Sequence, residues 1–418
     1  MNDRESLKAK GLELFNQARA HGENDRWEDA AETYRRAAEV DPGNVSILYN
    51  LANAYFRLGR WGRARRGFAR LLDIDPGHLQ GWINLGLTEM RDGEVEASIA
   101  ALRKAVGLED KNILAHLNLG LALLLGGQLE EGFAESEWRR HLLKLPFPDG
   151  GRPAWDGKDP EGKRILVYTE QGYGDAIHFL RYAGALAKRG ARVTVYCYPP
   201  LVRLAAATEG VEHAAGFGDP PPDFDAYAPL MSLPHLLGLA NIEGIPPAPY
   251  LKAPPPSPLI GGGGTARVGL VWSGSAARDD NISRSLSLAA LKPLLEVRGT
   301  TFYSLQMGAA AAEIEGEGLA GRLVDLSDSL GDFYHTAAIV QALDLLISVD
   351  TAFPHLAGAM GKPAWLLLSR VPDWRWFLEG SDTPWYPTQR LFRQSGEEGW
   401  APLVDRVGDE LVRLAART

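Results

Sequence analysis

The fold is decided by the stretch Leu346-Ile-Ser-Val-Asp-Thr-Ala-Phe-Pro-His-Leu-Ala-Gly-Ala-Met-Gly-Lys-Pro-Ala-Trp-Leu-Leu-Leu-Ser369. The apolar run 345–349 predicts a buried strand, residues 351–360 suit a short helix, and residues 364–368 predict a second buried strand. A polar turn, Asp350-Thr351, therefore stands at the carboxyl end of the first strand, where open α/β sheets bind their ligands. The free N–H groups of the following helical turn favour an anion there, such as a diphosphate.

The spacing alone leaves two interpretations of this turn open. His355 follows Thr351 by one helical turn, so both side chains can face the same side and meet one ligand. Alternatively, Asp350 or Thr351 only caps the helix and His355 is a surface residue.

An earlier stretch has the same order of strand, turn, helix and strand. Residues 164–169 predict a strand, the turn Gly172-Tyr-Gly-Asp175 leads into an amphipathic helix, and residues 192–197 predict the next strand. This turn lacks the third glycine of a dinucleotide-binding fingerprint, and no suitable ribose-binding acid ends the next strand, so we expect no NAD site. Asp175 itself has a plain structural explanation, because Asp is a common helix N-cap.

A Pro- and Gly-rich segment, residues 252–265, is typical of an interdomain linker. Strand and helix signals alternate again after it, up to a final helix near residues 403–416. The sequence therefore predicts two Rossmann-like halves, residues 163–251 and 266–418.

Residues 1–145 repeat with a period of about 34, which is typical of tetratricopeptide (TPR) repeats with two antiparallel helices each. The clearest unit spans residues 45–78, and a fourth copy begins at Ile113 and degrades around Gly132. Small residues recur where the two helices approach each other. The sequence thus predicts an N-terminal α-solenoid, followed by a connector at residues 146–162. The concave face of the solenoid is expected to hold a protein partner. Alternatively, the repeats only brace the next domain or mediate self-association.

Composition and charge exclude several other classes of protein. The net charge of -9 argues against general nucleic-acid binding. The single cysteine, Cys197, allows neither an internal disulfide nor a cysteine-based zinc site, and a core position is expected for it. The polar N-terminus has no signal peptide and no apolar run is long enough to span a bilayer, so we expect a cytoplasmic protein.

Several separate motifs carry a resemblance to a known family. The Ser348-Val-Asp-Thr-Ala stretch with His355, the segment Gly174-Asp-Ala-Ile-His178, and Asp373-Trp-Arg-Trp376 resemble motifs of the heptosyltransferase-like glycosyltransferases of family 9. They are most similar to the bacterial branch that carries TPR repeats before the transferase, a layout comparable to O-GlcNAc transferase of family 41. The resemblance implies the GT-B fold, in which the first half faces the acceptor, the second binds a nucleotide-sugar, and a cleft lies between them. It also implies that the final helix crosses back towards the first half.

The same resemblance implies roles for individual residues. Asp175 would be the catalytic base, with His178 as a second catalytic candidate. The donor-binding residues that it indicates are Ser273, Arg284, Gln306, Asp350, Thr351, Ala352 and His355. GT-B transferases generally need no metal, and the adjacent acids Asp279-Asp280 are weak evidence for one. We therefore expect no metal and no cofactor, the nucleotide-sugar being a substrate.

The function implied is that of a metal-independent, inverting glycosyltransferase. Its acceptor would be a protein recruited by the TPR repeats, and flagellin is the acceptor that this branch suggests. UDP, ADP, GDP and CMP donors all remain open. The alternatives are a binding protein in which a decayed transferase serves as a scaffold, and a transferase that acts on a cell-surface glycan. Trp374 and Trp376 either stack on a sugar or pack their loop against the core.

Overall fold

The computed structural model describes residues 3–261, 265–275, 281–396 and 399–416, and the chain divides into two compact units, Met1–Leu143 and Lys144–Thr418. Asp279 and Asp280 lie outside the described residues.

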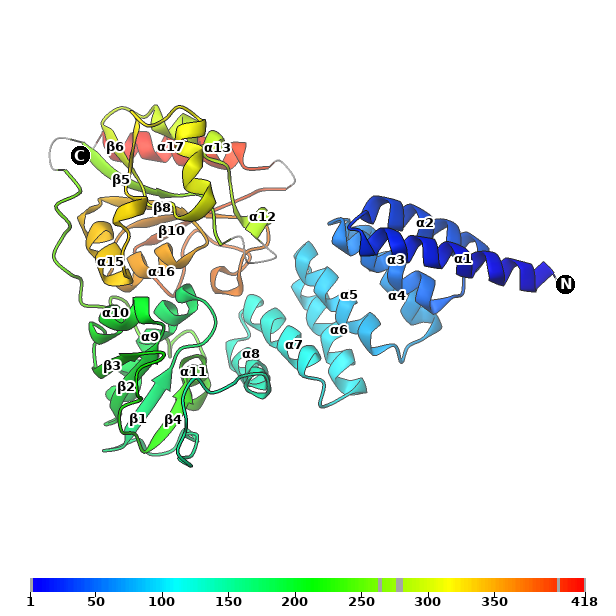
Figure 1. Ribbon diagram of the computed structural model, residues 1–418, viewed down its shortest axis with the longest axis horizontal. Coiled ribbons are helices and arrows are strands. Elements are labelled where there is room, and N and C mark those ends of the chain that lie inside the picture. Colours follow the sequence, from blue (N-terminus) through cyan, green and yellow to red (C-terminus); the bar gives the residue numbers. More distant parts are fainter. Residues whose placement is uncertain (1–2, 262–264, 276–280, 397–398, 417–418) are drawn as a thin grey trace. The chain divides into compact units, whose positions relative to one another are not determined.

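The first unit is a stack of helix pairs, coloured blue to cyan in Figure 1. Each helix packs against the next one along the chain. The helices are α1 (Asp3–Glu23), α2 (Trp27–Val40), α3 (Val45–Arg57), α4 (Trp61–Ile74), α5 (Leu79–Asp92), α6 (Val95–Leu108), α7 (Ile113–Leu125) and α8 (Leu129–Ser136). The solenoid predicted from the 34-residue period is therefore confirmed, with α8 as its shortened last helix.

Small residues at one repeat position allow the paired helices to approach closely. Ala18, Ala52, Gly86 and Gly120 follow one another at intervals of 34 residues. The two alanines are fully buried. A Cβ atom on Gly86 would lie 2.5 Å from Cγ of Leu102 on the partner helix, so no larger residue fits there. The 34-residue period of the sequence thus reflects a close contact between paired helices that recurs once in each repeat.

The second unit contains two all-parallel sheets, as the alternation of strands and helices predicts. The first sheet has the strand order β3-β2-β1-β4. Its elements are β1 (Arg164–Tyr168), α9 (Tyr173–Ala187), β2 (Arg192–Cys197), α10 (Val202–Ala206), β3 (Val211–Gly216), β4 (Ala226–Pro229) and α11 (Leu233–Leu236). Cys197 is fully buried at the end of β2, the core position expected for it.

The second sheet has the order β10-β9-β8-β5-β6-β7. Its elements are β5 (Ala266–Val271), α12 (Asn281–Arg284), α13 (Leu288–Leu295), β6 (Thr300–Ser304), α14 (Glu313–Gly316), β7 (Leu323–Asp325), α15 (Phe333–Ala342), β8 (Leu345–Val349), α16 (Ala352–Ala359), β9 (Ala364–Leu368), β10 (Gln389–Arg393) and α17 (Ala401–Ala415). In Figure 1, α13 and α17 lie together on one side of this sheet, and α15 and α16 lie on the other.

The final helix does not cross back to the first sheet as expected. One face of α17, formed by Leu403, Val404, Val407 and Leu411, is buried in the core of the second sheet with Leu288 and Leu291 of α13. An apolar face of this size is most stable where it is removed from water, and α13 provides that contact within the same half. The expectation from the resemblance is therefore wrong for the described part of this helix.

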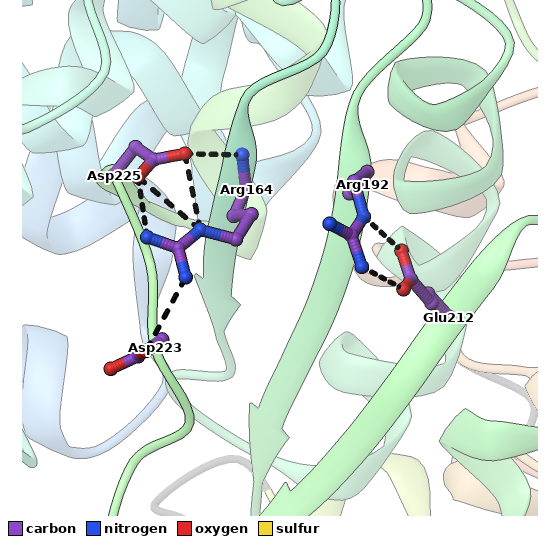
Figure 2. Close-up of polar contacts among 5 residues, drawn as sticks. All are labelled: Arg164, Arg192, Glu212, Asp223 and Asp225. Atoms are coloured by element: carbon purple, nitrogen blue, oxygen red, sulfur yellow. Dashed lines mark hydrogen bonds and ion pairs between the residues drawn. The ribbon is translucent and has the colours of Figure 1, made fainter.

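In each sheet, one pair of neighbouring strands begins with the same contact, which we call the Arg–Asp clasp. In the first sheet, Arg164 at the start of β1 binds Asp225, which directly precedes β4, through its backbone N–H (2.9 Å) and its guanidinium group (2.7 Å) (Figure 2). The backbone N–H of Asp225 in turn donates to the Arg164 carbonyl oxygen. In the second sheet, Arg267 of β5 binds Asp344, the residue before β8, in the same three ways. The residues that follow are paired in the same register, Ile165 with Ala226 and Val268 with Leu345. The clasp therefore sets the alignment of both strand pairs.

The clasp should make stability depend on pH. Hydrogen bonds from Arg164 lower the pKa of Asp225 to about 2. Since the unfolded carboxyl titrates at about 3.9, the clasp contributes fully above about pH 4 and is lost as the pH falls towards about 2. We expect Asp225→Asn to be less stable than wild type at neutral pH, and the gap in unfolding free energy to narrow as the pH falls from about 4 to about 3 in urea titrations. Asp223→Asn is the control, because that side chain is 83% exposed and touches Arg164 only at 3.4 Å. A gap for Asp225→Asn that does not change with pH would contradict this assignment.

Gly358 of α16 should tolerate no side chain. A Cβ atom there would lie 2.3 Å from Cδ1 of Tyr386, which is fully buried. We expect Gly358→Ala to lower the free energy of unfolding by about 1–3 kcal/mol through overpacking, measured by chemical denaturation. Gly408→Ala is a matched control, because Gly408 is also helical and its added methyl meets only Leu294 Cδ2, at 3.5 Å. That variant should gain up to about 1 kcal/mol from helix propensity. Equal stability of the two variants would show that Tyr386 does not pack as described.

Candidate functional site

A pocket of about 880 Å³ lies at the carboxyl ends of strands from both sheets. The first sheet contributes the loop Gln171–Asp175 after β1 and Tyr198 after β2. The second contributes residues after β5, β6, β8 and β9. They include Ser273, Arg284, Gln306, Asp350, Thr351, Ala352, His355, Asp373 and Arg375. All seven residues that the sequence indicated for the donor therefore line one cavity, together with Asp175.

At the start of α16, the Asp350-Thr351 turn both caps the helix and lines the pocket, so each of the two interpretations is correct in part. Thr351 is the N-cap, and its Oγ1 accepts a hydrogen bond from Phe353 N–H at 3.4 Å. His355, however, is not a surface residue, because it is only 4% exposed and lines the pocket. The cap therefore fixes the helix while its first turn forms part of the cavity wall.

Asp175 occupies a different helical position from the expected one. The N-cap of α9 is Gly172, and Asp175 is the third residue of the helix. Its Oδ2 accepts a hydrogen bond from Gly172 N–H at 3.0 Å, and its Oδ1 pairs with Arg375 at 2.5 Å. The side chain remains 15% exposed. Two contacts thus fix the orientation of the carboxylate, and each oxygen keeps a lone pair for a further partner.

The N-termini of α9 and α16 meet in the pocket wall. A Cβ atom on Gly174, in the first turn of α9, would lie 3.0 Å from His355 Cδ2 and 3.4 Å from Ala352 Cα. Only glycine allows the two helix starts to come this close without displacing one of them. Each helix start carries the positive end of a helix dipole, so their convergence favours a bound anion.

Two arginines add positive charge to the same wall. The guanidinium group of Arg284 donates to the carbonyl oxygen of Asp350 at 2.8 Å. Arg375, which is buried, donates to Asp373 at 2.8 Å as well as to Asp175. Burial and the neighbouring Asp373 raise the pKa of Asp350 to about 6. A carboxyl group with a shifted pKa in a cavity of this kind is typical of a functional site.

Gln306 lies in the pocket wall, but its side chain has a structural task. Its Oε1 accepts from the backbone N–H groups of Trp272 and Ser273, both at 2.9 Å. Its Nε2 donates to the carbonyl oxygens of Ser273 and Met307. Because both donors and both acceptor sites of the amide are used, Gln306 holds the loop after β5 in place and has no hydrogen bond left for a ligand.

His178 does not reach the pocket. Its side chain is fully buried, and Nδ1 lies 3.0 Å from the hydroxyl of Tyr386. As the sixth residue of α9 it faces the contact with α16 and not the cavity. The structure therefore separates the two catalytic candidates, leaving Asp175 in the wall and His178 behind it.

Arg375 and Asp373 line the pocket, although sequence reasoning gave neither of them a role in the site. Arg375 lies between Trp374 and Trp376, which are buried and pack the loop rather than face the cavity. The signal was present, because an arginine between two buried tryptophans needs acidic partners. The strand β10, which follows this region, is an edge strand of the second sheet.

The described residues contain no group of three or more His, Cys, Asp or Glu side chains that could hold a metal ion. In the same residues, no helix combines the length and the apolar character that crossing a membrane requires.

The helical unit offers a second candidate surface. An asparagine recurs every 34 residues on the first helix of each repeat: Asn16, Asn50, Asn84 and Asn118. These positions are not part of the packing pattern from which the repeats were predicted. Three of these first helices, α3, α5 and α7, also contact one another, which is expected on the inner side of a curved stack. Asn84 donates to Asn53 and to Tyr49. The row is therefore a line of polar amides along one side of the unit.

Comparison with known proteins identifies the first unit. The tetratricopeptide repeat model matches residues 15–78 and 82–136, so the chain carries TPR repeats. Protein FlbA of Caulobacter vibrioides is 28% identical over 298 residues. That match covers 63% of this chain and 48% of the relative, so the similarity spans about half of that protein's length.

Several solved structures are similar to about a third of this chain. The first TPR domain of Spaghetti (RPAP3), bound to an HSP90 peptide, has 21% identity and a TM-score of 0.26, covering 27% of this chain and 88% of that one. MamA from Desulfovibrio magneticus has 17% identity and a TM-score of 0.29, covering 32% and 73%.

Proposed function

We propose that the chain is a metal-independent, inverting glycosyltransferase that transfers a sugar from a nucleotide-sugar to a protein bound by its TPR repeats. The observation that carries the proposal is the pocket in which the starts of α9 and α16, Arg284, Arg375 and the oriented carboxylate of Asp175 come together. Two parallel sheets with a cavity at their carboxyl ends also agree with the GT-B architecture that the sequence motifs imply.

The donor's diphosphate is the group that the second sheet's side of the pocket suits best. At the start of α16, Phe353 N–H is donated to Thr351 Oγ1 and Pro354 has no N–H, so the helix offers an anion the N–H of Ala352 and the positive end of its dipole. Arg284 is held beside this helix start through the Asp350 carbonyl. A helix start and a guanidinium group can stabilise the negative charge of the leaving nucleotide without a metal ion. Thr351, Ala352 and His355 are the residues closest to this role.

Asp175 is the base in this proposal. It would take the proton of the acceptor hydroxyl as that oxygen attacks the anomeric carbon, while the bond from this carbon to the phosphate oxygen breaks. Its contacts with Gly172 and Arg375 hold the carboxylate in one orientation, which a positioned base requires. Attack from the side opposite the leaving diphosphate inverts the sugar's configuration.

The acceptor is proposed to be a protein, with flagellin as the candidate that the sequence motifs suggest. A carboxamide both donates and accepts hydrogen bonds, so asparagines of this row can pair with the backbone of an extended peptide regardless of its sequence. Asn84 could take part only as an acceptor, because both its N–H groups are donated to Asn53 and Tyr49. The TPR repeats that the family model matches support this assignment of the first unit to partner binding.

Nucleotide binding tests the donor site. Calorimetry of the full-length protein with UDP, GDP, ADP and CMP in the presence of EDTA should detect binding of at least one nucleotide. Arg284→Gln should weaken that binding by about tenfold or more, because a hydrogen bond to a charged group is lost. Arg298→Gln serves as a control, because Arg298 belongs to the exposed turn between α13 and β6 and does not line the pocket. Binding that strictly required a divalent ion would reject the metal-independent mechanism, and no binding at all would favour a scaffold protein.

Two variants that each remove a partner of Arg375 test the base. Asp175→Asn and Asp373→Asn each replace one carboxylate that pairs with this arginine, so each should lose about 1–3 kcal/mol of stability. The amide introduced by Asp175→Asn could still accept from Gly172 N–H but could not take up a proton. With a nucleotide-sugar carrying the nucleotide identified above, we expect release of the nucleotide to slow by about 10²–10⁴-fold in Asp175→Asn and by less than about tenfold in Asp373→Asn. Parental turnover in Asp175→Asn would exclude it as the base.

A further inference from the structure

Tyr386 lies between two histidines that belong to different halves of the second unit. Its hydroxyl oxygen is 3.0 Å from Nδ1 of His178 on α9 and 3.0 Å from Nδ1 of His355 on α16. All three side chains are buried. A phenol hydroxyl has one proton and can donate to one of these nitrogens only, so the other histidine must donate its own Nδ1–H to the phenol oxygen.

A third neighbour does not change this count. The hydroxyl of Tyr250 lies 3.4 Å from that of Tyr386, which is longer than either contact to a histidine. Tyr250 also donates its own proton to the carbonyl oxygen of Ile177 at 2.9 Å. The proton of Tyr386 therefore stays between the two histidines.

The surroundings of His178 decide in which direction the hydrogen bonds through Tyr386 run. Its Nε2 is buried and has no hydrogen-bond partner within the described part of the chain. A proton on that nitrogen would be an orphaned buried N–H, which proteins avoid more strictly than an unused acceptor. The proton of His178 therefore belongs on Nδ1, where it is donated to Tyr386. Tyr386 in turn donates to Nδ1 of His355, and the proton of His355 is left on Nε2.

His355 lines the pocket, and Nε2 is on the edge of its ring that the contact between Nδ1 and Tyr386 leaves available to face the cavity. The adjacent ring atom, Cδ2, is the atom nearest to a Cβ placed on Gly174 in the pocket wall, whereas Nδ1 points the other way, to Tyr386. Trp376 stacks against the ring at a centroid distance of 5.2 Å. The imidazole is thus held on one edge and one face, which leaves its Nε2 edge available to the cavity.

We propose that His178 and Tyr386 are positioning residues that fix the tautomer of His355, so that a neutral Nε2–H faces the pocket and donates to the phosphates of the donor. That the ligand is a phosphate rests on the proposed function, whereas the order in which His178, Tyr386 and His355 donate their hydrogen bonds does not. Sequence motifs alone assign His178 to the chemistry and say nothing of Tyr386, whereas the geometry gives both a part in orienting His355.

The charges around the two rings agree with neutral histidines. Burial lowers the pKa of both, with Arg181 and Arg375 adding to the effect for each. Both arginines keep their charge, so neither ring is expected to be doubly protonated near neutral pH. A neutral ring has one proton to place, and the contact with Tyr386 decides where it goes.

The tautomers can be observed directly in the full-length protein without any ligand. In a long-range ¹H–¹⁵N spectrum of protein labelled at histidine, assigned with His178→Gln and His355→Gln, we expect His178 to be protonated at Nδ1 and His355 at Nε2. Tyr386→Phe should remove the hydroxyl contact and change the His355 signals, whereas Tyr250→Phe, which removes a hydroxyl from the same cluster, should leave them in place. A wild-type His355 protonated at Nδ1 would overturn the proposal.

Binding of inorganic pyrophosphate, measured by calorimetry with EDTA, gives the functional readout. We expect about fivefold weaker binding in Tyr386→Phe, the equivalent of one net hydrogen bond, and a change of less than about twofold in Tyr250→Phe. Equal affinities for wild type and Tyr386→Phe would refute the role in positioning. If pyrophosphate binds to none of the proteins, the proposed donor site is wrong. The spectra still decide whether His178 donates to Tyr386 and Tyr386 to His355.

Discussion

The buried cation Arg181 constrains the second unit more than any other group. It is 1% exposed and contacts no carboxylate in the part of the chain that the structure describes. Its guanidinium group donates instead to the carbonyl oxygens of His178 and Trp385, and it lies over the rings of Tyr250 and Tyr386, each at 4.7 Å. A charge without these contacts would be very costly in the interior. The helix α9 of the first sheet and the segment around Trp385 of the second must therefore stay together, and this fixes the wall in which both helix starts meet.

The pocket itself is a balance of charge. Arg284, Arg375 and two helix starts bring positive potential to one place, and Asp175, Asp350 and Asp373 partly neutralise it. The acids are not interchangeable. Asp373 and Asp175 hold Arg375, whereas partial burial and the nearby Asp373 raise the pKa of Asp350 to about 6. An incoming anion would thus meet positive groups whose positions are already determined, so that little reorganisation accompanies binding.

The sequence predicted what depends on period and on strand order. The repeat period located the helix pairs through Ala52 and Gly86, and the polar turn at Asp350-Thr351 located the carboxyl edge of the second sheet. It could not predict contacts between segments far apart in the chain. His178 and Asp175 are three residues apart in one motif, yet one is sealed behind the wall and the other lines it. The use of Gln306 as a brace, the packing of α17 on α13, and the pairing of Arg375 with Asp175 likewise depend on tertiary neighbours that no local pattern encodes.

The Arg–Asp clasp has a consequence for how such a protein can diversify. In both sheets it sits at the amino ends of the strands, whereas the pocket lies at the carboxyl ends. Strand alignment is thus secured at the edge remote from the ligand, and in the same manner twice within one chain. Loops at the opposite edge can lengthen, shorten or exchange side chains without loosening that alignment. With such a scaffold, the binding specificity can change through substitutions in a few loops, while the pairing of the strands stays the same.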